Sequence, residues 1–471
     1  MGTQRYKLFV NYVDVLPFFI LFIFLFSSFS LPLHIFILTM RVLIVNTSER
    51  TGGAAVAAGR LMEALNNHGV KAKMLVRDKQ TDHLTVAALP GQKRMQLRFL
   101  WERFLIWLRL RFNREHLFEV DSACCGADIT NMREFQEADI IHLHWINQGM
   151  LSLRGIRKIL DSGKPVVWTM HDIWPATAIC HLTLDCRQFE TQCGHCRLLP
   201  NGGSDNDFAT QVWHRKQKML ENRQITFVAC SQWLAGEAQK SALLAGQQIK
   251  SIPNPIDTHI YAPKDKQQAR KAVGLPIEGR IILFASQRVT NRNKGMNYLV
   301  EACRLLAEQH PEQKDDITVA ILGGHAEEIE GQLPFRTCPL GYVNDEQRIV
   351  NIYNAVDVFV LPSLSENLPN TIMEAMACGV PSVGFRIGGI PEEIDHQQNG
   401  YVANYCDSED LAHGIWWTLF EADQEAVRHA CLQKVAHNYS QQSVANRYLE
   451  VYESLHRHYY LYCCAYLAAH T

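Results

Sequence analysis

Short runs rich in β-branched residues alternate with segments of helical periodicity along most of this chain. Residues 41–46 (RVLIVN) predict a strand, and residues 54–69 predict a helix, because their apolar side chains recur at three- and four-residue spacing up to Gly69. Such alternation is typical of βαβ units, in which the strands are parallel. Further strands of this series are predicted at residues 138–145, 164–172 and 225–232. The pattern therefore predicts a doubly wound α/β domain over residues 40–250.

A proline-rich stretch separates this series from a second one of the same kind. Residues 251–263 hold three prolines and no periodicity, so we place a linker at residues 251–258. A second domain is expected over residues 259–435, because 471 residues exceed what one hydrophobic core usually supports. Its strands are predicted at residues 280–288, 316–324, 356–363 and 380–385. The predicted fold is α/β, with two Rossmann-like domains facing a cleft where ligands bind beyond the carboxyl ends of the strands.

Charge and cysteine usage narrow the classes of function. A formal net charge of -2 gives no basic excess for binding phosphate backbones, so nucleic acid is not expected as a partner. Of the fourteen cysteines, most stand singly in apolar runs, such as Cys230, Cys303 and Cys378, where reduced thiols behave as small apolar groups. This usage favours a reducing compartment, and we expect a cytoplasmic protein.

The amino-terminal extension, residues 1–39, allows three interpretations. Residues 16–38 carry no formal charge and are numerous enough to cross a bilayer as a helix, with Arg5 and Lys7 ahead of them. A signal peptide fits less well, because the apolar run is too long and has no small-residue cleavage site. The third interpretation, which we favour, is that Met40 is the true start, directly before the first strand.

Two features of the first half fall at expected ligand positions. Gly52 and Gly53 follow the first strand and open a helix, where bare backbone amides can approach an anion, although a structural turn explains them nearly as well. The pair is not the GxGxxG fingerprint of a nicotinamide site, which disfavours an oxidoreductase. His171 ends the strand at 164–172 and would project into the cleft, although a lone histidine is often structural.

The second half supplies cations after its first strand. Arg288 and Lys294 lie in the loop before a helix expected to begin near Met296. Two fixed cations beside a helix amino terminus suit a diphosphate, which accepts paired guanidinium hydrogen bonds. An exposed basic loop is the alternative.

The stretch ENLPNTIME, residues 366–374, carries two glutamates with two interpretations. Thr371 and Glu374 have the T-x-x-E spacing of a capping box, in which Glu374 only satisfies backbone donors. Alternatively, the Asn370 and Thr371 amides face a phosphate, Glu374 accepts hydrogen bonds from vicinal ribose hydroxyls, and Glu366 reaches the sugar. Spacing alone does not separate the two.

This stretch resembles the E-x7-E segment of retaining family 4 glycosyltransferases, which have the GT-B fold, with the usual aromatic residue replaced by Asn367-Leu368. The resemblance extends over nearly everything from Met40. It includes the glycine loop, the strand ends ADIIHLHW and VVWTMHDIW, the IPNPID linker and the loop with the two cations. The family resemblance also implies a terminal helix, residues 436–471, that packs back across the first domain.

The resemblance assigns roles to individual residues. It implies that Glu374 holds the donor ribose and that Arg288 and Lys294 neutralise the departing diphosphate. It further implies that His171 contacts the transferred sugar near its reacting carbon, and that Glu366 lies near the donor sugar. In the mechanism proposed for such enzymes the acceptor hydroxyl attacks from the leaving-group side, so that neither a catalytic metal nor a protein nucleophile is required.

A cysteine cluster follows His171. Residues 180–196 contain Cys180, Cys186, Cys193 and Cys196, and the last two have the C-x2-C spacing of metal ligands. A structural zinc site, an oxidised pair and free thiols all remain open. A similar insertion occurs in a subgroup that resembles colanic-acid and other exopolysaccharide glycosyltransferases, where we expect it to be structural.

Residues 92–118 mix aromatic residues with seven basic residues between Lys93 and Arg114. Such a segment can lie on an anionic membrane or contact a lipid-linked acceptor. On a helical wheel, however, Arg94, Arg98 and Arg109 cluster while the remaining arginines point elsewhere. A core-packing helix with solvated arginines is therefore an equal alternative to peripheral contact with the inner membrane.

The function we predict is a retaining, nucleotide-sugar-dependent glycosyltransferase that extends a bacterial exopolysaccharide or lipopolysaccharide at the cytoplasmic face of the inner membrane. Its acceptor would be a saccharide or a lipid-linked saccharide. A non-catalytic sugar-nucleotide-binding or scaffold protein of the same pathway is the alternative, and it would tolerate the loss of Glu374.

Overall fold

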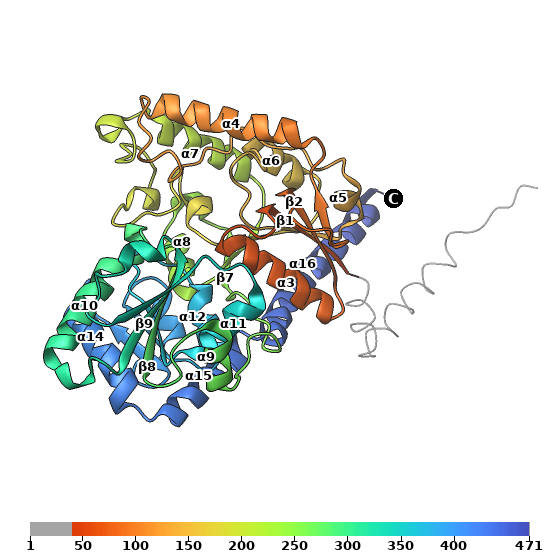
Figure 1. Ribbon diagram of the computed structural model, residues 1–471. Coiled ribbons are helices and arrows are strands. Elements are labelled where there is room, and N and C mark those ends of the chain that lie inside the picture. The colour runs from red at the N-terminus through yellow and green to blue at the C-terminus, as the bar shows by residue number, and fades with distance from the viewer. Residues whose placement is uncertain (1–39, 471) are drawn as a thin grey trace, which may run out of the picture.

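The computed structural model describes residues 40–470 of the chain and contains two α/β domains (Figure 1). Each domain is built on one parallel sheet. In the first sheet the strand order is β3-β2-β1-β4-β5-β6-β7, and in the second it is β10-β9-β8-β11-β12-β13. Both contain the 3-2-1-4-5-6 order of a doubly wound Rossmann fold, in which the order reverses beside the first strand. The predicted pair of Rossmann-like domains is confirmed.

The first domain contains seven strands and the helices that connect them. Its strands are β1 (Arg41–Ser48), β2 (Lys71–Asp78), β3 (Val86–Ala88), β4 (Ile140–Leu143), β5 (Val166–Met170), β6 (Thr226–Ala229) and β7 (Gln248–Ser251). Its helices are α3 (Gly53–Asn67), α4 (Gln92–Arg109), α5 (Arg133–Glu137), α6 (Leu153–Asp161), α7 (Phe208–Leu220) and α8 (Gln232–Gln239). β1 lies centrally, where Ile44 is in register with Met74 of β2 and His142 of β4.

The second domain repeats this construction with six strands. These are β8 (Arg280–Arg288), β9 (Ile317–Gly324), β10 (Arg336–Gly341), β11 (Val358–Leu361), β12 (Ser382–Phe385) and β13 (Gly400–Ala403). The helices from here to the carboxyl end are α9 (Lys266–Val273), α10 (Met296–Gln309), α11 (Glu346–Ala355), α12 (Asn370–Ala377), α13 (Ile390–Glu393), α14 (Ser408–Trp416), α15 (Gln424–Asn438) and α16 (Gln441–His470).

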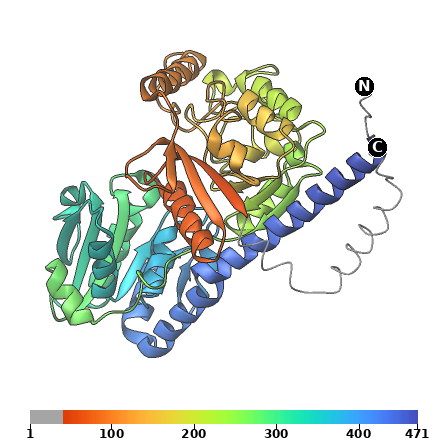
Figure 2. The same ribbon diagram turned by 90° about the vertical axis from the view of Figure 1, so that its right-hand side faces the viewer.

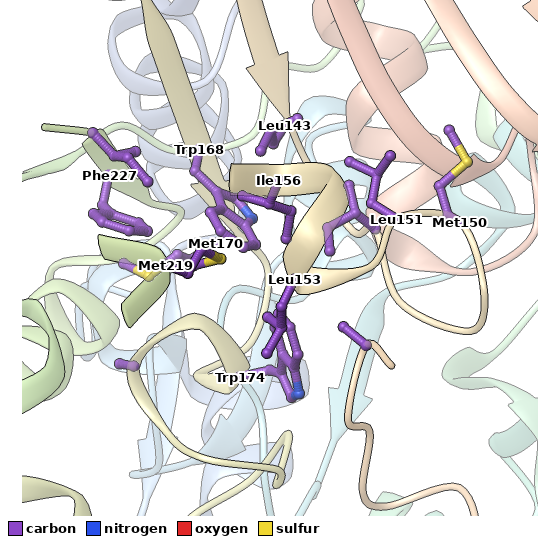
Figure 3. Packing of buried hydrophobic residues seen from close by; sticks show 14 of the residues in the cluster. Leu143, Met150, Leu151, Leu153, Ile156, Trp168, Met170, Trp174, Met219 and Phe227 are labelled. Atoms are coloured by element: carbon purple, nitrogen blue, oxygen red, sulfur yellow. The ribbon is translucent and has the colours of Figure 1, made fainter. Parts of the chain in front are cut away.

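Both faces of each sheet are covered, which explains the continuous apolar runs of the central strands. In the first domain Trp168 of β5 stacks on Phe227 of β6 with 5.7 Å between ring centroids, and Trp174 packs nearby (Figure 3). The other face is completed by α16, which runs back along the first domain (Figure 2). Tyr448 and Tyr452 of α16 hydrogen-bond to Thr169 and His142, so the end of the chain is part of the first domain's core.

Several strands were not predicted from the sequence, namely β2, β3, β7, β10 and β13. They are short or interrupted by polar residues, as in KAKMLVRD of β2, and lack the apolar continuity of the central strands. Within residues 40–470, no helix combines the length and apolar character needed to cross a bilayer. The predictions for residues 16–38 lie outside the described part of the chain.

The core of the second domain contains one carboxyl group without a partner. Glu393 is fully buried, and neither of its carboxylate oxygens has a hydrogen-bond partner among the described residues. Burial raises the pKa of Glu393 well above its usual value, and the nearby charges of Glu366 and Glu392 add to the shift. The proton is therefore held more tightly in the folded chain than in the unfolded one.

This raised pKa predicts a loss of stability with rising pH. Below the unfolded pKa of about 4.3 the protonated Glu393 carries no penalty, and above it folding loses about 1.4 kcal/mol per pH unit until the folded pKa is reached. Glu393→Gln should therefore melt close to the wild type at pH 5 and higher at pH 8, by about 2–4 °C per kcal/mol. Glu278→Gln, which changes an exposed carboxylate, is the control. A melting difference that does not change between the two pH values would contradict the assignment.

Candidate functional site

A cavity of about 850 Å³ lies between the two domains. Residues that follow strands of both sheets form its walls, as expected for ligand sites in doubly wound folds. From the first domain the wall includes Gly53, Ala54, His171, Asp172, His181, Leu182, Leu184 and Trp233. From the second it includes Ser286, Gln287, Lys294, Glu366, Asn367, Asn370, Thr371 and Tyr405. Of the nine residues predicted for catalysis and donor binding, six therefore surround one space, namely Gly53, His171, Lys294, Glu366, Asn370 and Thr371.

His171 is held with both ring nitrogens engaged. Nε2 lies 2.9 Å from Nδ1 of His144, and Nδ1 lies 3.4 Å from Sγ of Cys230. Burial lowers the pKa of His171 to about 4, so the ring is neutral at physiological pH. A neutral imidazole at the end of β5 can contact an uncharged sugar, but it adds no positive charge for a leaving phosphate.

The neighbouring Asp172 forms a pair with His181 that the sequence reasoning missed. Asp172 accepts from His181 Nδ1 at 2.8 Å and from Trp145 Nε1 at 2.9 Å. Burial alone would lower the pKa of His181, but the charge and hydrogen bond of Asp172, together with the charge of Asp121, outweigh burial and raise that pKa above the usual value. The only sequence signal was the position of His181 in the cysteine insertion directly after the His171-Asp172 strand end.

The two cations of the second domain have separate positions. Lys294 lines the cavity and forms an ion pair with Glu366. Arg288 is exposed at the end of β8, donates from Nε to Thr290 Oγ1 at 3.0 Å, and is not part of the cavity wall. Near the end of β8, Ser286 and Gln287 line the cavity instead. The predicted pairing of both cations against one diphosphate is therefore not preformed.

The capping-box interpretation of residues 371–374 is wrong. α12 begins at Asn370 after Pro369 and has no side-chain cap, so Thr371 already lies inside the helix. Glu374 points away from the backbone donors of the first turn. Its Oε1 accepts from Arg60 Nη2 at 2.7 Å, and its Oε2 accepts from Tyr353 OH at 2.9 Å. Glu374 is absent from the cavity wall.

Arg60 reaches Glu374 from the opposite domain. It lies on the buried face of α3, and the Arg60 and Glu374 side chains are only 9% and 11% exposed. The Arg60 guanidinium also lies over the Tyr261 ring, 4.9 Å from its centroid. Its Nη1 is buried without a hydrogen-bond partner in the described structure. An arginine on an otherwise apolar helix face was the one sequence signal for this contact.

Other polar side chains of the second domain fasten the same interface. Asn367 donates from Nδ2 to the His171 carbonyl at 3.1 Å, and its side-chain Oδ1 accepts from Ser231 Oγ at 2.6 Å. Asn370 donates to the Gly53 carbonyl at 3.2 Å. Glu392 accepts from the Gln232 and Trp233 amides at the start of α8, at 2.8 and 2.7 Å. The segment 366–374 is thus both a wall of the cavity and the main polar link between the domains.

The glycine loop stands opposite this segment. Gly52 has φ of 90°, a left-handed conformation that favours glycine, and it precedes α3 without a side-chain cap. A Cβ on Gly53 would lie 3.8 Å from Nδ2 of Asn370, so the loop approaches α12 closely. The amino-terminal ends of α3 and α12 therefore meet at the cavity, and their dipoles favour an anion there.

The cysteine insertion is held without a disulfide. Cys180, Cys186, Cys193 and Cys196 are free thiols. No group of three or more histidine, cysteine or acidic side chains in residues 40–470 is arranged to hold a metal ion, so structural zinc stays a prediction. The fully buried Lys216 donates to the Trp174 and Thr177 carbonyls at 2.5 and 2.9 Å. These hydrogen bonds hold the segment just before the insertion.

The sequence matches two family models. Residues 51–260 match Glycosyltransferase Family 4, and residues 279–419 match Glycosyl transferases group 1. The chain is 28% identical over 333 residues to D-inositol 3-phosphate glycosyltransferase of Corynebacterium urealyticum, covering 67% of this chain and 72% of that relative. The chain covers about half the length of three further relatives with this activity in their names, at 46%, 49% and 52%.

Solved structures share the arrangement of the two domains. A glycosyltransferase from Rickettsia africae superposes with a TM-score of 0.58 at 16% identity, covering 88% of this chain and 98% of that one. Anabaena Alr3699/HepE in complex with UDP-glucose gives a TM-score of 0.57 at 16% identity, covering 88% and 100%. At this identity the likeness establishes the fold alone, and it confirms the predicted GT-B architecture.

The ion pair between the domains predicts a strong coupling of two variants. Arg60→Met leaves Glu374 buried with Tyr353 as its remaining partner, which should cost about 3–5 kcal/mol and lower the melting temperature. Glu374→Gln should also destabilise, because it leaves Arg60 buried without a countercharge. The double variant should lose less stability than the two single variants lose together, since no charge is then left unpaired. Strictly additive losses in differential scanning calorimetry would show that the pair does not form.

Proposed function

We propose that this chain, which belongs to the glycosyltransferases and carries their family 4 and group 1 domains, transfers a sugar from a nucleotide-sugar donor to a saccharide or lipid-linked saccharide. The observation that carries the proposal is the cavity between the domains. It brings the amino-terminal ends of α3 and α12, Lys294 and Glu366 to one place. Relatives named D-inositol 3-phosphate glycosyltransferase, and a structural neighbour solved with UDP-glucose, support a donor of this class.

The chemistry depends on positive charge at the leaving group. Cleavage of the bond between an anomeric carbon and a nucleoside diphosphate leaves negative charge on the phosphate oxygens. Preorganised donors and cations aimed at that charge lower the barrier most effectively. Lys294 and the two helix ends supply them in this cavity. We propose that Arg288 joins them by a side-chain movement, because it lies outside the cavity wall in this structure.

Glu374 is the proposed hydrogen-bond acceptor for the donor ribose. In this structure Arg60 occupies the position that the ribose would take. Both Glu374 oxygens already accept one hydrogen bond each, from Arg60 and Tyr353. A carboxylate has further lone pairs, but the ribose needs access, and Glu374 does not line the cavity. Donor binding should therefore move Arg60 or rotate the domains apart.

The remaining roles follow the family resemblance. His171 would contact the transferred sugar, and Glu366 would lie beside it after releasing Lys294 to the diphosphate. We propose retention of the anomeric configuration, with the diphosphate taking the proton of the attacking hydroxyl. The acceptor would belong to an exopolysaccharide or lipopolysaccharide assembled at the cytoplasmic face of the inner membrane. The scaffold alternative keeps nucleotide binding but no transfer.

Nucleotide binding should raise the melting temperature of the protein. UDP or UDP-glucose at about 100 times its dissociation constant should stabilise by roughly 2.7 kcal/mol, which corresponds to several degrees. Glu374→Ala should abolish this increment, because the ribose loses its acceptor. GDP and ADP test the choice of base.

The matched control is Glu392→Ala. Glu392 also links the two domains but lies outside the cavity wall, so its loss should lower the melting temperature and leave the UDP increment intact. Equal increments in both variants would remove Glu374 from the donor site. No increment with any nucleoside diphosphate, in a folded protein, would remove support for a donor site altogether.

A further inference from the structure

α4 has two apolar faces, and only one of them is covered. Met95 and Ile106 face the core of the first domain. The opposite face carries five large apolar residues at helical spacing, each at least 40% exposed. They are Leu97, Leu100, Trp101, Phe104 and Leu108. Soluble proteins rarely leave such a continuous apolar stripe open to water unless it binds something.

The exposed charged residues of the stretch 92–114 are all basic, and the acidic Glu115 follows it. Lys93 and Arg94 stand exposed at its beginning, and Arg109, Arg111 and Arg114 at its end. The single acidic residue of the stretch 92–114, Glu102, is fully buried. Among the described residues, the ion pairs of this stretch all belong to Arg103. The exposed cations therefore keep their charge available to an external partner.

The helix is rigidly attached, so the stripe is a fixed surface. Arg103 is buried and donates to Asp121 at 2.7 Å and to the Leu117 carbonyl at 2.8 Å. Glu102 accepts from the Cys124 amide at 3.0 Å. Arg103 therefore holds α4 to the core, and the opposite, apolar face of the helix is exposed.

We propose that this stripe, with the basic residues at its two ends, docks on an anionic lipid surface. Aromatic and leucine side chains suit the headgroup boundary, and the lysine and arginines suit the negative charge of the lipids. α4 lies on the outer side of the first domain, away from the second domain (Figure 1). Docking there leaves the second domain in water. The inference gives the membrane contact of the proposed function a surface and a lipid class, and it does not depend on the donor site.

Vesicle binding of the full chain tests the proposal. Vesicles of phosphatidylcholine with 30% phosphatidylglycerol, a composition chosen as roughly a third anionic, should protect peptides within residues 92–111 from hydrogen exchange. Pure phosphatidylcholine should protect them less, and high salt should weaken the effect. Trp101→Asp with Phe104→Asp should reduce binding about a hundredfold, because each apolar side chain contributes about a factor of ten.

The matched control replaces exposed apolar residues elsewhere. Leu84 and Tyr342 are 98% and 65% exposed and lie outside α4, so Leu84→Asp with Tyr342→Asp should leave vesicle binding unchanged. Both double variants should keep their UDP-induced stabilisation, which separates loss of docking from loss of the donor site. Three results would overturn the proposal: no protection of residues 92–111, equal protection by neutral and anionic vesicles, or a stripe-dependent dimer in light scattering without vesicles.

Discussion

A buried ion pair, Arg60 to Glu374, joins the two domains of this protein. Two charges removed from water are tolerated only when they meet each other in good geometry, so the pair fixes how α3 and α12 approach. The asparagines at 367 and 370 and Glu392 extend the same link with neutral and charge-assisted hydrogen bonds. The cavity depends on this contact between the domains, because both domains contribute residues to its walls.

The same contacts limit which polar groups of the cavity region are available to a ligand. Lys294 is neutralised by Glu366, and Glu374 is covered by Arg60. A nucleoside diphosphate would offer both groups a replacement: phosphate oxygens for Lys294 and ribose hydroxyls for Glu374. A ligand shifts a conformational equilibrium only by its difference in affinity for the two states. In the proposed donor site this difference would come from Lys294 exchanging Glu366 for phosphate and from Glu374 exchanging Arg60 for ribose. In the proposed donor site, nucleotide binding and domain movement would therefore depend on the same residues.

The fold was predictable because its signal is local. Apolar runs such as RVLIVN and VDVFVLPS identify central strands, and the alternation with helices identifies parallel sheets. The contacts of the site are not local. Arg60 and Glu374 are 314 residues apart in sequence. The T-x-x-E spacing was compatible with a capping box, which the structure lacks because α12 begins at Asn370, one residue before Thr371. The exposed stripe of α4 was equally hidden, because periodicity shows that a helix has an apolar face and does not show which face is covered.

We infer that the segment 366–374 exchanges its links to the first domain for contacts with a nucleotide. The decisive experiment is a crystal structure of the full chain with UDP. In that structure we expect ribose hydroxyls within hydrogen-bonding distance of Glu374, the diphosphate at Lys294 and the amino-terminal end of α12, and Arg60 no longer paired with Glu374. UDP bound elsewhere, or bound in the cavity with the Arg60–Glu374 pair intact and the ribose out of reach of Glu374, would contradict it.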